Sequence, residues 1–139
     1  MNETSKDMTK LLLKISVMLM VAIAACGQGK THYEKLVAEA TRYFEEEQYS
    51  LAAQIYQEAL AFNVPDPAID YNLAECYRST FNYTEAEVYY LKVLYTGQSQ
   101  YPLSLFYYGL MLKLNGNISE AKERFDQFIT FHEKNIFMQ

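Results

Sequence analysis

The sequence predicts an all-α protein built of three helical hairpins, and three observations lead to this prediction. From residue 33 onward, apolar residues recur with the period of α-helices rather than the alternation of strands. One pattern of large residues and alanines then appears three times, with its alanines 34 and 35 residues apart. Turn and capping residues separate the predicted helices, which we place near 33–47, 50–62, 67–80, 84–96, 102–115 and 118–134.

The repeated pattern lies in the second helix of each hairpin. Its three copies are Tyr49-x-x-Ala52-x-x-x-Tyr56, Tyr83-x-x-Ala86-x-x-x-Tyr90 and Ile118-x-x-Ala121-x-x-x-Phe125. In the first helix of each hairpin, a small residue stands three places before a large one; the small residues are Ala40, Ala74 and Gly109. This arrangement resembles the tetratricopeptide repeat over about residues 33–135, with copies near 33–66, 67–101 and 102–135. The resemblance implies a short right-handed α-solenoid.

The resemblance also implies a packing role for each conserved position of the pattern. Ala52, Ala86 and Ala121 let the second helix of a hairpin approach the first closely. Tyr56, Tyr90 and Phe125 fill the space between successive repeats. A single hairpin cannot bury both of its faces, so about three repeats are needed for a stable domain.

Two features depart from the usual repeat. The glycine expected at the hairpin turn is Glu47 in the first copy and Phe81 in the second. Only five residues follow Lys134, too few for the additional helix that often covers the last repeat. We therefore expect the final helix to expose apolar residues, namely Phe125, Phe128, Ile129 or Phe131. Self-association through this helix, or a sequence cut from a longer protein, would explain such an exposed face.

The first helices of tetratricopeptide repeats line a concave groove that holds peptides. The resemblance places eight residues in that groove: Phe44, Tyr71, Asn72, Glu75, Arg78, Phe106, Tyr107 and Leu110. The cations that clamp a peptide carboxylate in such domains are missing, because Glu34, Ala38, Ala68, Leu103 and Tyr107 occupy the neighbouring positions. We expect a groove for a partner helix or an apolar peptide segment. The alternative for any one of these aromatic residues is that it packs between helices.

The N-terminal segment has the pattern of a bacterial secretion signal. Lys6, Lys10 and Lys14 precede an apolar run over residues 15–25, which is shorter than the roughly 20 residues that span a bilayer. The run ends in the sequence Ile-Ala-Ala-Cys-Gly at 23–27, which resembles a bacterial lipobox. The resemblance implies that residues 1–25 are removed and that Cys26 carries a lipid, with 26–32 as a tether. A transmembrane anchor and an ordinary signal peptide are the alternatives.

The residues after Cys26 indicate a destination. Gly27 stands where an Asp would retain such a lipoprotein in the inner membrane, which favours the outer membrane. Gln28, Gly29 and Lys30 lack the acidic character that directs some lipoproteins to the cell surface. We therefore expect an outer-membrane lipoprotein facing the periplasm, with the inner membrane and the cell surface as alternatives.

Composition argues against several classes of function. The formal charge is −5 and no dense run of Lys or Arg is present, so we expect no nucleic-acid partner. His32 and His132 lie at opposite ends of the domain without ligands at metal-binding spacing, so we expect no metal or other cofactor. Residues 27–31 resemble the end of a phosphate-binding loop, but Ala24 replaces its first glycine and no strand is predicted. No nucleophile motif appears, and we expect no enzymatic activity.

The sequence thus predicts a membrane-anchored adaptor of the bacterial envelope that binds a peptide or helix of another envelope protein. The alternative is a structural role as the anchoring or self-associating repeat module of a larger envelope assembly. A homo-oligomer would then form through the C-terminal helix.

Overall fold

The computed structural model describes the backbone of residues 3–136 and the side chains of residues 8, 10–20 and 31–133. The chain forms two compact units, Met1–Lys35 and Leu36–Gln139. Six helices and no strands are present within residues 3–136, which confirms the all-α prediction.

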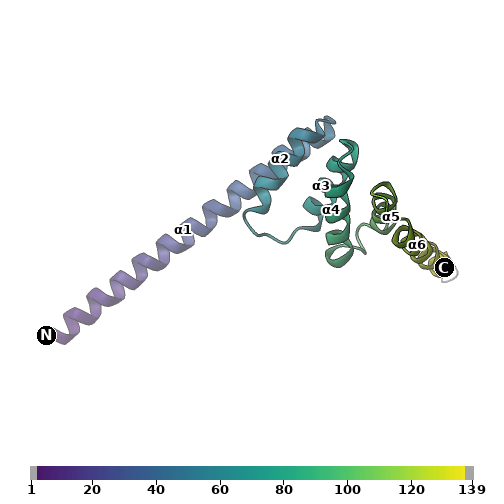
Figure 1. Cartoon of the computed structure of the whole chain (residues 1–139). Helices are drawn as coiled ribbons and strands as arrows, with labels where there is room; N and C mark the ends of the chain where they lie inside the picture. Colours follow the sequence, from purple (N-terminus) through teal and green to yellow (C-terminus); the bar gives the residue numbers. More distant parts are fainter. Residues whose placement is uncertain (1–2, 137–139) are drawn as a thin grey trace. The chain divides into compact units, whose positions relative to one another are not determined.

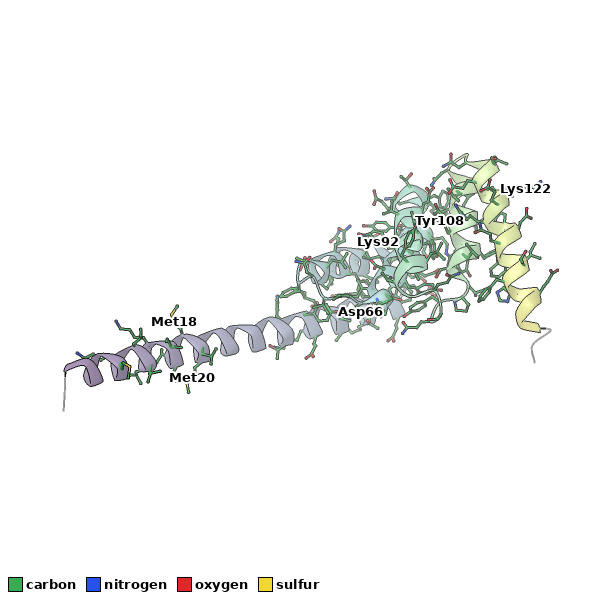
Figure 2. The ribbon with its side chains drawn as sticks, turned by 90° about the horizontal axis from the view of Figure 1, so that it is seen from below. Met18, Met20, Asp66, Lys92, Tyr108 and Lys122 are labelled. Atoms are coloured by element: carbon green, nitrogen blue, oxygen red, sulfur yellow. The ribbon has the colours of Figure 1, made fainter. Side chains whose placement is uncertain are left out.

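The first helix, α1 (Glu3–Glu45), continues from one unit into the other. Over residues 11–20 its apolar side chains are exposed, and Figure 2 shows Met18 and Met20 projecting from opposite sides. The charged residues over positions 10–20 are Lys10 and Lys14, which lie four residues apart and so share one side of the helix. Among the described residues, no helix is long and apolar enough to cross a membrane.

The expectation that the first helix of the repeats begins near residue 33 is wrong. Residues 26–32 are helical and form part of α1. Gly27 and Gly29 each weaken a helix by only about 1 kcal/mol relative to Ala, and the first proline of the chain is Pro65. Nothing in this segment is therefore strong enough to end the helix. The side chain of Cys26, the predicted lipidation site, lies outside the described side chains.

Five helices follow α1 and complete three hairpins with the part of α1 after residue 35. They are α2 (Tyr49–Leu60), α3 (Pro67–Ser79), α4 (Tyr83–Thr96), α5 (Ser104–Leu114) and α6 (Ile118–Ile136). Figure 1 shows α3 beside α4 and α5 beside α6, and α2 packs on α3 as α4 packs on α5. Each helix therefore contacts its neighbours in the chain, which is the arrangement of a short α-solenoid.

The three hairpin turns have one geometry despite different sequences. In the second hairpin the N–H of Asn82 donates to the carbonyl of Tyr77, and the N–H of Phe81 donates to that of Arg78. The other turns repeat this pair of hydrogen bonds, which is the Schellman helix ending. The left-handed residue is Glu47 (φ 60°), Phe81 (φ 62°) or Gly116 (φ 91°). In two of the hairpins, a residue with a side chain thus adopts the left-handed backbone conformation for which glycine is best suited.

Helix starts are less regular than helix ends. Asp66 caps α3, with its carboxylate accepting a hydrogen bond of 2.9 Å from the N–H of Ala68. The spacing of Thr84 and Glu87 resembles a capping box, but none forms, because α4 begins at Tyr83 and Thr84 lies inside it. The start of α5 expected at residue 102 is also wrong, since residues 102–103 form a turn before Ser104.

Small residues occupy the places where helices approach most closely. Ala52 and Ala86 are fully buried, and Ala121 is 2% exposed. A methyl group added to Gly109 would come within 3.0 Å of the Phe125 ring, so α5 and α6 are close there as well. Tyr56 and Tyr90 are fully buried between repeats. Phe125 stands at the same position of the third repeat but is half-buried, because no described helix covers it.

Candidate protein-interaction site

The inner slot is the surface of the second hairpin against which α5 packs. We define it by six residues of α3 and α4, of which Arg78 and Tyr90 contact α5: Tyr71, Glu75, Arg78, Tyr90, Val93 and Leu94. The ring of Tyr107 from α5 stacks on Tyr90 with centroids 5.5 Å apart. The guanidinium of Arg78 lies 5.0 Å from the centroid of the same ring. Tyr107 is therefore held between an aromatic face and a cation.

A polar network lies beneath Tyr107. Tyr90 donates its hydroxyl hydrogen to the carboxylate of Glu75, and the guanidinium of Arg78 donates both to Glu75 and, over 3.1 Å, to the Tyr90 oxygen. Burial, and after it the bond to Glu75, raises the pKa of Tyr90 above its ordinary value. The bond to Glu75 likewise raises the pKa of Arg78. The three groups satisfy one another, so the network holds the inner slot together and leaves Arg78 with its charge neutralised.

Four of the predicted groove residues are held by contacts inside the domain. Tyr71 stacks on Tyr101 with centroids 4.4 Å apart, and burial raises its pKa to about 12. Asn72 donates a hydrogen bond of 2.8 Å to the hydroxyl of Tyr56. The remaining two are Glu75 and Arg78, which belong to the polar network. Tyr71, the aromatic residue among the four, has the contacts of the packing alternative, since its ring also lies 6.3 Å from that of Tyr90 on α4.

The other four groove residues belong to α1 and α5. Phe44 packs edge-on against Tyr49 at the first hairpin, with centroids 5.5 Å apart. Tyr107 fills the inner slot. Phe106 and Leu110 line an open cavity at the far end of the domain. Tyr107 also contacts Phe106, with ring centroids 5.6 Å apart, so contacts join residues of α3 and α5, and the single groove of eight residues stays a prediction.

The end slot is that open cavity, and it has a volume of about 450 Å³. It lies between α5 and α6, and its residues are Phe106, Leu110, Lys113, Phe125, Phe128 and Ile129. Phe106 contacts both Phe125 and Phe128, with centroids 5.6 and 5.5 Å away. Ile129 is 52% exposed and Phe106 is 38% exposed. This is a concave apolar surface open to solvent, which is the usual character of a binding site.

The two slots occupy equivalent positions of successive repeats. The six residues of the end slot are the six residues of the inner slot moved by 35 positions, the distance from Ala86 to Ala121. Tyr71 corresponds to Phe106 and Tyr90 to Phe125. The end slot is therefore the place where a further helix would pack if it followed the geometry of α5, and no helix within residues 3–136 fills it.

This position is characteristic of a stacked helical repeat, and comparison with solved structures agrees. The second TPR of Spaghetti (RPAP3), in a complex with the HSP90 peptide SRMEEVD, superimposes with a TM-score of 0.61. It is 21% identical, and the match covers 70% of this chain and 90% of that one. The fold is that of a tetratricopeptide-repeat domain. No protein-family model matches the chain, and no curated protein matches it.

Sequence reasoning about this repeat domain missed the end slot as a single site. It expected Phe125, Phe128 and Ile129 to be exposed but assigned Phe106 and Leu110 to a different surface. Lys113 was not considered. Adding 35 to the residue numbers of the inner slot would have identified all six residues of the end slot as one site. Elsewhere, the described residues contain no cluster of three or more potential metal ligands, and Cys76 is a buried free thiol whose pKa burial raises to about 12.

Proposed function

We propose that this chain is a membrane-anchored adaptor that binds another protein of the bacterial envelope and catalyses no reaction. The observation behind the proposal is the end slot, an apolar cavity of about 450 Å³ open at one end of a tetratricopeptide-repeat fold. The similar solved domain was captured with a peptide, which supports a protein-binding role for this fold. Three aromatic rings and two aliphatic side chains line the cavity here. Apolar anchors of this kind dominate the energetics of protein interfaces.

The partner segment we propose is apolar and does not depend on a terminal carboxylate. The peptide in the similar structure, SRMEEVD, is acidic. In this chain Arg78 is neutralised by Glu75, and Asn72 is bonded to Tyr56. Lys113 is the one basic residue among those that line the end slot. An acidic peptide tail would find few cations here, whereas an apolar segment would bury its surface against Phe106 and Phe128.

The anchor in this proposal is a lipid on Cys26. Exposed apolar residues around the N-terminal part of α1 are consistent with a segment that enters a membrane during export. Confinement at the membrane would raise the local concentration of the repeat domain near other envelope proteins, so a weak contact would suffice. The destination we propose is the outer membrane, with the repeat domain facing the periplasm.

The intact mass of protein purified from membranes of the native host tests the anchor. A mass that equals a chain beginning at Cys26 with added acyl groups supports the proposal. An unmodified mass of the full chain would contradict lipidation, because acylation precedes cleavage in lipoproteins.

Photo-crosslinking in the host tests the adaptor role. A benzophenone amino acid would replace Leu114, which is 47% exposed at the end of α5, or Tyr95, which is 84% exposed on α4. We expect one defined envelope protein to be crosslinked from position 114 and not from position 95. Absence of any crosslinked protein from several exposed positions would contradict a protein-binding function.

A second candidate function is self-association as part of a larger assembly. It is favoured by two apolar residues exposed on α6, Ile129 (52%) and Phe131 (45%). Light scattering at increasing protein concentration distinguishes the two functions. A constant monomer mass supports the adaptor, and a mass that rises to a defined oligomer supports self-association.

A further inference from the structure

The end slot is the strongest unassigned feature of the domain, and the inner slot shows how such a surface is filled. The inner slot receives α5, which buries Tyr108 and Met111 and stacks Tyr107 on Tyr90. The occupant is thus a helix of about three turns that presents one aromatic ring at its centre. Because the end slot repeats the same positions, a helix of the same kind has the shape that fits it.

The residues that differ between the slots determine the chemistry of the occupant. Glu75 and Arg78 of the inner slot correspond to Leu110 and Lys113 of the end slot. The carboxylate that neutralises Arg78 is therefore replaced by an aliphatic side chain. Within residues 31–133, Lys113 makes no ion pair and remains exposed. An occupant that covers the end slot is favoured if it brings a carboxylate to Lys113.

A second copy of this chain, stacked end to end, is a poor occupant. The residues of α1 that correspond to Tyr107, Tyr108 and Met111 are Ala38, Glu39 and Arg42, and all three are exposed. Such stacking would bury the charges of Glu39 and Arg42 against the phenylalanine rings of the end slot. Burial of a charge without a partner is strongly unfavourable, so the first helix of the solenoid does not suit this surface.

We propose that the end slot binds one amphipathic helix of a different protein, placed on the third repeat as α5 is placed on the second. The partner helix inserts an aromatic ring between Phe125 and Lys113, in the manner of Tyr107 between Tyr90 and Arg78. One helical turn away it presents a carboxylate to Lys113. This inference rests on the proposed adaptor function and specifies the segment that the adaptor recognises.

A synthetic peptide tests the end slot without knowledge of the natural partner. The probe is a labelled, helix-stapled copy of residues 101–116 in which Leu110 is replaced by Glu, one turn from its Tyr107. Fluorescence anisotropy measures its binding to the full chain reconstituted in lipid nanodiscs. We expect saturable binding that weakens tenfold or more with Phe128→Asp. A matched control, Tyr95→Ser on α4, leaves the affinity unchanged.

A charge exchange keeps the test independent of any folding defect in Phe128→Asp. Lys113 is an exposed residue, so Lys113→Glu retains the fold. We expect this variant to bind the Glu probe about threefold more weakly and to bind best a second probe that carries Lys in place of that Glu. Replacement of the tyrosine of the probe by alanine weakens binding tenfold or more.

Three results would overturn this inference. They are the absence of saturable binding, binding that Phe128→Asp leaves unchanged, and a dimer of the free protein that Phe128→Asp dissociates. The last result would make a second copy the occupant. If the photo-crosslinked partner is found while the peptide fails to bind, the adaptor function stands and its site lies elsewhere. If the peptide binds and no envelope partner is found, the end slot stands and the proposed function fails.

Discussion

The inner slot and the end slot are equivalent surfaces of consecutive repeats, yet they differ in what lies against them. The inner slot is covered by α5, and it holds a buried tyrosine with a carboxylate and a guanidinium that satisfy one another. The end slot has a phenylalanine at the tyrosine position and a leucine at the carboxylate position. The inner slot thus has hydrogen-bonded polar groups under a covering helix, and the end slot has apolar groups open to solvent.

The difference shows that a repeat position acquires its role from the neighbour that covers it. Tyr90 stabilises the solenoid because Tyr107 stacks on it, whereas the described ring contact of Phe125 is with Phe106 of its own hairpin. Covering an exposed apolar surface with a partner removes it from water and lowers the free energy. The end slot is therefore suited to binding a partner, whereas the inner slot stabilises the folded domain.

The largest expected effect comes from truncation of the two equivalent aromatic residues. Tyr90→Ala should lower the free energy of unfolding by about 3–5 kcal/mol, because a fully buried ring and its hydroxyl contacts are lost. Phe125→Ala should lower it by only about 1 kcal/mol, since its ring is half-buried. Urea denaturation followed by circular dichroism measures both values. Equal losses would mean that the end slot is covered in solution.

The polar network should give the next largest effect. Glu75→Ala leaves Tyr90 and Arg78 without their shared acceptor in a half-buried place, and we expect a loss of about 2 kcal/mol. Leu110→Ala at the equivalent position of the end slot should cost less than about 1 kcal/mol, because that side chain is already in contact with solvent. Urea denaturation of the Glu75→Ala and Leu110→Ala variants compares the two losses. Glu75→Gln is the control that retains a hydrogen-bond acceptor.

A smaller effect, of opposite sign, is expected at the hairpin turns. Phe81 has φ 62° and is 77% exposed, so Phe81→Gly should raise the stability of the second hairpin by about 1 kcal/mol. Gly116→Ala in the third hairpin should lower stability by about the same amount, because it places a side chain at φ 91°. Thermal unfolding checks this pair. A destabilised Phe81→Gly protein would show that the contact of Phe81 with Tyr83 outweighs backbone strain.

The smallest effect is a dependence of stability on alkaline pH, which Tyr71 of the inner slot should contribute and Phe106 of the end slot should not. Burial raises the pKa of Tyr71 to about 12, while the unfolded chain ionises this residue near pH 10. The stability from Tyr71 is therefore complete below about pH 9 and falls as the pH rises from 10 toward 12. At pH 10 the loss is at most about 0.4 kcal/mol, because Tyr71 is partly exposed to water.

Tyr71→Phe removes this contribution, so the variant should lose less stability than the native chain between pH 8 and pH 10. Phe106, the equivalent residue of the end slot, does not titrate. Denaturation at the two pH values compares Tyr71→Phe with Phe106→Leu as the control. An unchanged pH dependence in Tyr71→Phe would contradict burial of Tyr71.

The fold could be predicted from the sequence because periodicity, spacing and turn residues all indicate the same repeat. The alanines at 52, 86 and 121 alone give the register of the hairpins. The continuous helix through residues 26–32 was missed, because glycines disfavour a helix without ending it. The sequence also did not predict that the six residues of the end slot form one site, and the reason is different. Whether Tyr71 or Phe106 faces a neighbour or solvent depends on which helix follows, and this is a property of the assembled repeats.

Hydrogen exchange of backbone amides in the monomeric full chain tests most directly whether the end slot is open. We expect the amides of α4, which packs against α5, to exchange at least tenfold more slowly than those of α6. We also expect addition of the helical peptide to slow exchange in α6 and to leave α4 unchanged. Equal protection of α4 and α6 in the free monomer would contradict an open end slot, because α6 would then already be covered.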